Sequence, residues 1–330
     1  MRDTQRRRTL PIFSDVAKTA MALSMIERRI LQSLTYSSRV ATLFAVFFFA
    51  CAAGPDTASA ARSAWVDTAG GGIRLVTGAR LADGTLPAML EIRLEPGWRT
   101  YWTDPGASGI PPEVTITATG PGADDFVYSG LRLPPPKRFA EGDLTYTGYD
   151  QPVAFPLLLK TGTGGSGNSG ASGALTLEAS VFLGICKSIC IPVQAQLDVA
   201  LADAQAGAAA DNPLDTARVR SAFAALPAPP SPDFNVAEAR FDATGHAIAL
   251  ALTLPEGATL SDVFLAAPSG YAFGPLQSET DATGRTQVRI PTKRPLKASG
   301  LPADGSIRAT ISVKRPGGMA AMETPLVFKP

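Results

Sequence analysis

Apolar and polar residues alternate along several stretches of this chain. Apolar side chains occupy every second position in 90–94, 175–183 and 193–199, with mostly polar residues between them. The same pattern returns at 248–254 and 307–313. A period of two places alternate side chains on one face of a β-strand. These stretches therefore predict strands that are buried on one face.

Between residues 64 and 201 no helical period of 3.6 is sustained. The 31 glycines and 28 prolines among 330 residues exceed the ordinary usage of about 7% and 5%, which favours many turns and short strands. We therefore expect an all-β chain whose residues 61–203 form an antiparallel β-sandwich. Residues 234–330 are expected to form a second, smaller β-domain without cysteine.

Two stretches interrupt the strand pattern. Residues 161–174, TGTGGSGNSGASGA, hold no large apolar group, and we interpret them as a flexible hairpin-type insertion. Residues 204–233 are expected to be a linker with one short helix. Asn212-Pro213 is a helix-start signal, and the proline-rich run at 227–232 would end the helix.

The N-terminal part has the features of an export signal. The apolar run at 40–53 is shorter than the roughly 18–20 residues that span a bilayer, and arginines precede it. Ala58-Ser59-Ala60 matches the small-x-small pattern of signal peptidase sites. We therefore predict that 1–60 is a signal peptide and that the chain is periplasmic. An acylated Cys51, as in a lipoprotein, is the alternative, and the true start codon stays open.

Charge and composition exclude several classes of function. The 30 Lys and Arg residues are balanced by 29 Asp and Glu residues, so no positive excess is available to neutralise a nucleic acid. A zinc hydrolase or a Ser-His-Asp enzyme would depend on the single histidine, His246. We expect no nucleic-acid partner, no cofactor and no metal.

Cys186 and Cys190 are the two cysteines that remain after export, in a compartment where disulfides form. In a straight strand their Cα atoms would lie about 13 Å apart, whereas a disulfide needs about 4.4–6.8 Å, so a bond requires a turn within 187–189. Closing so short a loop removes only about 2 kcal/mol of unfolded-state entropy. The pair is thus a thiol-redox pair, a local structural disulfide or a soft-metal site.

The remaining candidate residues have simpler interpretations. We assign Trp98, Tyr101 and Trp102 to core packing, since aromatic residues of this density usually form the core of a sandwich. Residues 104–106, Asp-Pro-Gly, predict a turn. Met319 and Met322 offer thioethers that suit Cu(I).

Three separated motifs resemble one known family. The run at 97–112, GWRTYWTDPGASGIPP, the later YTGY motif at 146–149 and the segment 186–192 look like the periplasmic N-terminal domain of DsbD-type thiol:disulfide interchange proteins. The likeness is greatest to the branch with the suppressor-of-copper-sensitivity membrane reductases. It covers about 64–203, and 234–330 resembles that branch's second β-domain more loosely.

The resemblance implies an immunoglobulin-like sandwich and a role for two cysteines. They would receive electrons from a transmembrane reductase and pass them to periplasmic thioredoxin-like or disulfide-isomerase proteins. Onto this chain that role maps to Cys186 and Cys190, and the family's second cysteine usually makes the intermolecular bond. The family also packs an aromatic group over the pair, for which Phe139 and Tyr146 are the candidate shielding residues.

Longer family members continue into a multi-helix membrane domain, which these 330 residues do not contain. We therefore expect a separately encoded transmembrane thiol reductase as electron source. The alternatives from other functional classes are a non-enzymatic immunoglobulin-like interaction module with a structural disulfide and a periplasmic copper-binding protein.

Overall fold

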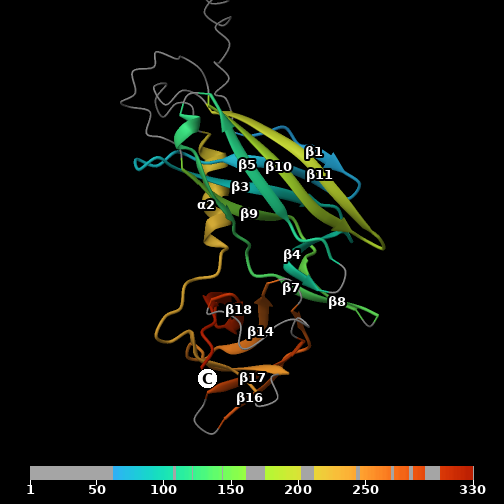
Figure 1. Ribbon diagram of the computed structural model, residues 1–330, viewed down its shortest axis with the longest axis vertical. Coiled ribbons are helices and arrows are strands. Elements are labelled where there is room, and N and C mark those ends of the chain that lie inside the picture. The colour runs from blue at the N-terminus through green and yellow to red at the C-terminus, as the bar shows by residue number, and fades with distance from the viewer. Residues whose placement is uncertain are drawn as a thin grey trace, which may run out of the picture. The chain divides into compact units, whose positions relative to one another are not determined.

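Two antiparallel sheets face each other in the first half of the computed structural model (Figure 1). One sheet has the order β1 (Val66–Thr68), β2 (Gly71–Thr77), β3 (Thr85–Leu94), β9 (Val153–Lys160), β6 (Val127–Leu131). The other has the order β11 (Cys190–Leu201), β10 (Leu175–Cys186), β4 (Arg99–Gly106), β8 (Leu144–Tyr149), β7 (Lys137–Glu141), and β5 (Glu113–Thr119) also pairs with β10.

The structure describes residues 62–329, except 107–108, 121, 143, 161–174, 202–211, 243–245, 269–270, 282–284 and 294–304. The predicted signal peptide with Cys51, the glycine-rich insertion and the first part of the predicted linker lie outside the described residues. Ala58–Pro330 belongs to one compact unit.

The predicted alternation places apolar side chains between the two sheets. Along β10, Leu177, Ala179 and Val181 are fully buried, and the polar residues between them lie closer to solvent. β10 and β11 are in register along their whole length, from Leu175 opposite Leu201 to Cys186 opposite Cys190. This first core confirms the all-β, immunoglobulin-like sandwich that the sequence predicts.

Two local predictions were wrong. The insertion at 161–174 does not connect a hairpin, because β9 belongs to one sheet and β10 to the other. Residues 104–106 do not leave the sheet in a turn: they end β4, which is irregularly paired with β8 between Tyr101 and Gly106. Gly106 adopts a φ of 87°, a conformation open to glycine, so the strand absorbs the irregularity.

The predicted helix is α2 (Pro213–Ala224), and the Asn212 side chain accepts a hydrogen bond from the backbone N–H of Leu214 at its start. Val219 and Ala222 pack against Val76 of β2 and Met89 of β3. The residues next to Val76 and Met89 along their strands, such as Leu75 and Leu90, belong to the first core. Val76 and Met89 therefore lie on the outer face of that sheet, and α2 covers this face. The helix of the predicted linker is thus packed against this sheet.

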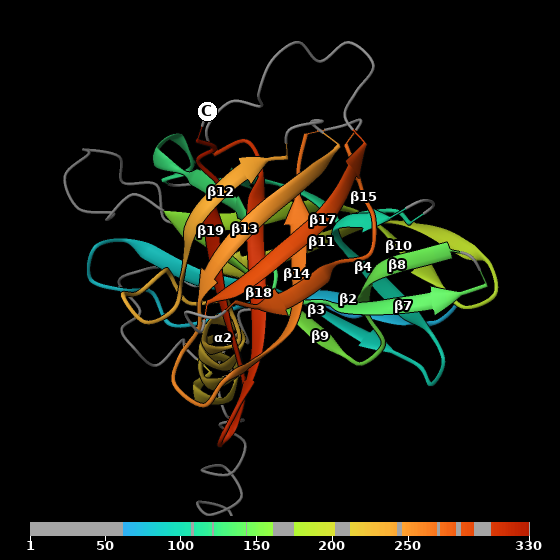
Figure 2. The same cartoon turned by 90° about the horizontal axis from the view of Figure 1, so that it is seen from below.

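A second core follows, formed by two further antiparallel sheets (Figure 2). One has the order β12 (Asn235–Phe241), β13 (Ala247–Thr253), β17 (Thr286–Lys293), β15 (Ala272–Phe273), with β16 (Gln277–Thr280) also on β17. The other has the order β14 (Thr259–Ala266), β18 (Arg308–Arg315), β19 (Gly318–Pro325). In the described part of the chain, α2 and a 3₁₀ turn, η1 (Ala123–Asp125), are the helical elements.

Strand β14 takes part in both cores. Val263 and Leu265 lie in the second core, whereas Phe264 between them lies in the first, where its ring meets the edge of Trp102 with the centroids 6.0 Å apart. Within the described ranges, no helix is long and apolar enough to cross a membrane.

Candidate functional site

The two cysteines lie at the tip of the β10–β11 hairpin. β10 ends at Cys186 and β11 begins at Cys190, so three residues form the turn. The N–H of Lys187 donates to the carbonyl of Ile189 across 3.1 Å. The Cα atoms of Cys186 and Cys190 lie 4.1 Å apart, and the sulfurs are bonded. The predicted turn within 187–189 is confirmed.

The two sulfur-bearing residues differ in their access to solvent. Cys186 is only 2% exposed, since β10 pairs with β11 on one side and Cys186 lies opposite Arg99 of β4 on the other. Cys190 is exposed at the start of β11, which is the edge strand of its sheet. Next to it, Ile189 is 69% exposed. Cys190 is therefore the member of the pair that faces solvent.

Tyr101 of β4 brings a hydroxyl group to the disulfide. Its oxygen lies 3.1 Å from Sγ of Cys190, and since a disulfide sulfur carries no hydrogen, the tyrosine is the donor. Tyr101 as a whole is only 2% exposed. The assignment of Tyr101 to packing alone is incomplete: the ring packs, and the hydroxyl group contacts the disulfide.

Glycines make room for the Tyr101 ring. A Cβ atom on Gly109 would lie 2.7 Å from the ring, and one on Gly184 of β10 would lie 3.3 Å from it. Thr100, next to Tyr101, fixes the strand by donating its hydroxyl to the carbonyl of Gly184 at 2.9 Å. A glycine inside an apolar strand often marks the close approach of another group, and Gly184 was the sequence signal for this one.

The predicted shielding residues lie on the other side of Tyr101. Phe139 of β7 and Tyr146 of β8 are directly opposite each other in the β7–β8 hairpin. The Tyr146 ring centroid is 6.1 Å from that of Tyr101, and the Arg99 guanidinium is 5.9 Å from the Phe139 and Tyr146 centroids. Tyr146 thus lies against the tyrosine that contacts the sulfur, and Phe139 lies beside Arg99. The shielding role of both residues stays a prediction.

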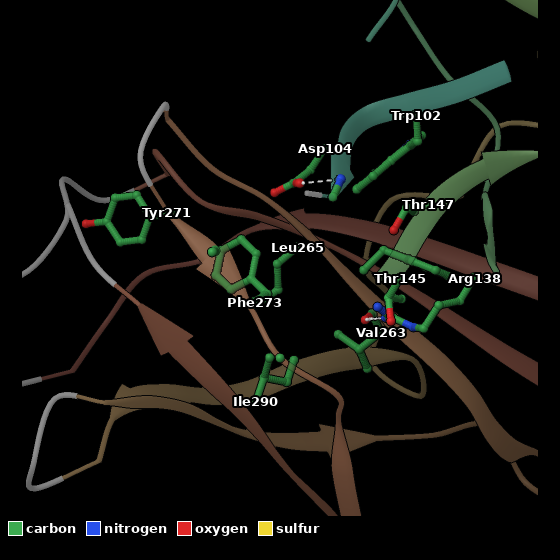
Figure 3. A pocket seen from close by; sticks show the side chains of 14 residues that line it. Trp102, Asp104, Arg138, Thr145, Thr147, Val263, Leu265, Tyr271, Phe273 and Ile290 are labelled. Atoms are coloured by element: carbon green, nitrogen blue, oxygen red, sulfur yellow. Dashed lines mark hydrogen bonds between the residues drawn. The ribbon is translucent and has the colours of Figure 1, made fainter. Parts of the chain in front are cut away.

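A cavity of about 310 Å³ lies on the far face of this hairpin (Figure 3). Its lining includes Trp102, Asp104 and Arg138 from the first-core strands and Val263 and Phe273 from the second-core strands. Burial raises the pKa of Asp104, while the N–H of Gly106 and the charge of Arg138 act in the opposite direction.

The remaining candidate residues lie away from the cysteines. Trp102 is buried in the first core, as expected, and Trp98 is partly buried against it. His246 is exposed. Met322 is fully buried in the second core, whereas Met319 is 60% exposed. In the described part of the chain, no group of three or more His, Cys, Asp or Glu side chains is arranged to hold a metal ion.

Part of the first β-domain matches a known protein family. Residues 76–202 match the family model described as thiol:disulfide interchange protein DsbD, N-terminal. The resemblance inferred from the motifs is thus confirmed over that range. No curated protein sequence matches the chain.

Among solved structures, the N-terminal periplasmic domain of ScsB from Proteus mirabilis is 21% identical. The match covers 81% of this chain and 99% of that one, with a TM-score of 0.57, and it establishes the fold. A marsupial T cell receptor chain matches with 12% identity over 78% of this chain and 98% of its own, at a TM-score of 0.16 that carries no argument.

Proposed function

We propose, taking residues 76–202 as a DsbD-type N-terminal domain, that this chain is a periplasmic thiol:disulfide interchange module. Cys186 and Cys190 would accept two electrons from a separately encoded transmembrane thiol reductase. They would deliver them to periplasmic thioredoxin-like or disulfide-isomerase proteins. In this proposal 1–60 is the export signal, 61–203 the redox domain, 204–233 the linker with α2 and 234–330 the second β-domain.

One observation carries this proposal: the pair closes a three-residue turn with one sulfur-bearing residue exposed and the other buried. Thiol–disulfide exchange needs a sulfur that an external thiolate can approach, and a second thiol held beside it. Cys190 meets the first need, and Cys186 meets the second. A purely structural disulfide has no need of this asymmetry. The loop is also too short for the bond to add much stability.

The two thiols have separate roles in the proposed reaction. In the reduced protein, the Cys190 thiolate attacks the partner's disulfide, forming a mixed disulfide and releasing one partner thiolate. Cys186, as a thiolate, then attacks Sγ of Cys190, closing the intramolecular disulfide and releasing the second partner thiolate. The partner gains two electrons, and the chain is reduced again by the membrane reductase through the same steps in reverse.

Replacing one cysteine at a time tests these roles. Cys186→Ala removes the resolving thiol, so we expect a mixed disulfide between Cys190 and a periplasmic thioredoxin-like protein to accumulate. It would be seen as a dithiothreitol-sensitive band on non-reducing gels and identified by mass spectrometry. Cys190→Ala is the matched control and should trap much less.

Two outcomes would count against the proposal. An adduct that accumulates in Cys190→Ala would reverse the roles of the two cysteines. If neither variant traps a partner, and the oxidised wild type is never reduced in cells, the relay itself is wrong.

A further inference from the structure

Neighbouring side chains of β7 point to opposite faces of the β7–β8 hairpin, as strand geometry requires. Phe139, with Tyr146 opposite, faces the Arg99 and Tyr101 side of the redox site. Arg138 faces the other way, toward β14. Thr145 and Thr147 of β8 line the same cavity as Arg138, on this second face (Figure 3). The hairpin thus lies between the redox site and the second core.

Arg138 binds β14 through two nitrogens of its guanidinium group. Nε donates to Oδ2 of Asp262 at 3.0 Å, and Nη2 donates to Oδ1 at 2.9 Å. Nη2 also donates to the backbone carbonyl of Val263 at 3.1 Å, and the group lies 5.1 Å from the Phe264 ring centroid. A bidentate arginine–carboxylate pair, with two parallel hydrogen bonds, is stronger and more directional than an ion pair with one hydrogen bond.

The pair is well placed to resist the water and salt that weaken most surface ion pairs. The side chains of Arg138 and Asp262 are only 31% and 18% exposed. Exposed pairs contribute little because solvent screens them and both side chains lose freedom on pairing. Here the neighbouring Phe264 ring already restricts the arginine.

The two ends of this contact differ in how firmly they are held. β14 is fixed on both faces, with Val263 and Leu265 in the second core and Phe264 in the first. β7 is the edge strand of its sheet, and β8 joins β4 through a short, irregular register. The ion pair therefore ties a weakly held hairpin to a firmly held strand.

We propose that Arg138 and Asp262 are positioning residues for the redox site. Their pair holds the β7–β8 hairpin so that Tyr146 stays against Tyr101 and Phe139 stays beside Arg99, which limits the approach of reagents to the disulfide from that side. The second core thereby controls access to a bond that it does not touch. This inference deepens the proposed function and rests on it for its biological purpose.

The rate at which a small thiol reduces the disulfide tests this inference. The oxidised full chain is mixed with excess glutathione, samples are quenched by alkylation, and the reduced fraction is followed by mass spectrometry. We expect Arg138→Ala and Asp262→Asn each to react about tenfold faster than wild type, which is within the range of coupling between residues in contact. Arg138→Lys keeps the charge but not the bidentate geometry, and its rate should be intermediate.

A double variant and a matched control make the result specific. Arg138→Ala with Asp262→Asn should react no faster than either single variant, because both remove one contact. Arg289→Ala removes a different ion pair of the second core, Arg289 Nη2 to Asp242 Oδ2 at 2.7 Å, and should react as the wild type does. Circular dichroism checks that each variant is folded. If Arg138→Ala does not fold, the rate is compared between Arg138→Lys and wild type instead.

The outcomes separate this inference from the proposed function. Rates equal to wild type in folded Arg138 and Asp262 variants would overturn the positioning role, and so would additive acceleration in the double variant. A wild-type disulfide that resists millimolar glutathione would instead count against the exchange function. The same rate ratios, measured with dithiothreitol, would then still decide the positioning role.

Discussion

Tyr101 contributes to the core and to the proposed redox site with different parts of one side chain. Its ring fills the space left by two glycines, and its hydroxyl group donates to Sγ of Cys190. After reduction, the same hydroxyl group is placed to donate to the Cys190 thiolate. A hydrogen bond to the charged form of an acid favours that form. Tyr101 is therefore expected to increase the fraction of Cys190 that is ready to attack.

Removing only the hydroxyl group tests this role. In a Cys186→Ala background with one reduced thiol, Tyr101→Phe should slow the alkylation of Cys190 by iodoacetamide at pH 7 by about tenfold, because hydrogen bonds to charged groups contribute about 1.5–3 kcal/mol. The ring and its packing are kept. Tyr146→Phe, whose ring lies behind that of Tyr101, is the control and should leave the rate unchanged. Equal rates in all three proteins would show that the hydroxyl group has no effect on the thiol.

Asp104 introduces a pH dependence of stability. Its pKa is raised chiefly by burial, against the opposing effects of the Gly106 N–H and the Arg138 charge. A carboxyl group with a raised pKa in the folded state favours folding most when it is protonated. Its contribution is therefore complete below the unfolded pKa of about 3.9 and is lost as the pH rises through the folded value.

Replacing Asp104 by asparagine removes this loss. Asp104→Asn should melt a few degrees higher than wild type at pH 7, since the amide oxygen can still accept from Gly106, and the two should converge below about pH 3. Calorimetry across this pH range measures the difference. Asp83→Asn is a control of opposite sign: the Thr85 N–H lowers the pKa of Asp83, so this variant should be less stable than wild type at neutral pH. A difference for Asp104→Asn that does not change with pH would contradict this explanation.

At the scale of elements, the regular strands could be predicted and the irregular ones could not. β10 and β11 alternate strictly, and their cysteines, four positions apart, could bond only across a turn. The end of β4 could not be predicted, because its Asp-Pro-Gly sequence at 104–106 is typical of a turn. A glycine with positive φ and an irregular pairing keep these residues in the sheet.

Contacts between distant parts of the chain explain what the sequence could not predict. Asn212-Pro213 indicated where α2 begins, but not that Val219 and Ala222 would pack on the outer face of a sheet. Arg138 and Asp262 are 124 positions apart. No local pattern connects such residues, because their pairing depends on how the two cores meet. The hydroxyl group of Tyr101 lies at Cys190, 89 positions away, because β4 and β11 flank β10 in one sheet, and no local pattern predicts that contact either.

At the scale of the whole molecule, β14 connects the two cores. Neighbouring side chains of this strand are buried in different cores. If β14 left one core, apolar side chains in the other core would therefore be exposed as well. Burial of apolar surface is the main favourable contribution to folding. We therefore expect the two cores to unfold together.

Truncating the shared side chain should separate them. Phe264→Ala is expected to cost about 3–5 kcal/mol and to replace one calorimetric transition by two. Val288→Ala, inside the second core and away from the first, lowers the stability as well but should keep a single transition. Two transitions in the wild type, or one in Phe264→Ala, would show that β14 does not couple the cores.

The tight turn at the tip of the β10–β11 hairpin links folding to reduction through a thermodynamic cycle. The bond stabilises the folded state against unfolding by a certain free energy. Around the cycle, the free energy of reducing the bond is less favourable in the folded chain than in the unfolded chain by the same amount. For so short a loop the entropic part is only about 2 kcal/mol, whereas β10 and β11 are joined by twelve paired positions. We therefore expect the oxidised and reduced chains to share one folded structure, so that the proposed exchange reaction would change a covalent bond without taking the protein toward its unfolded state.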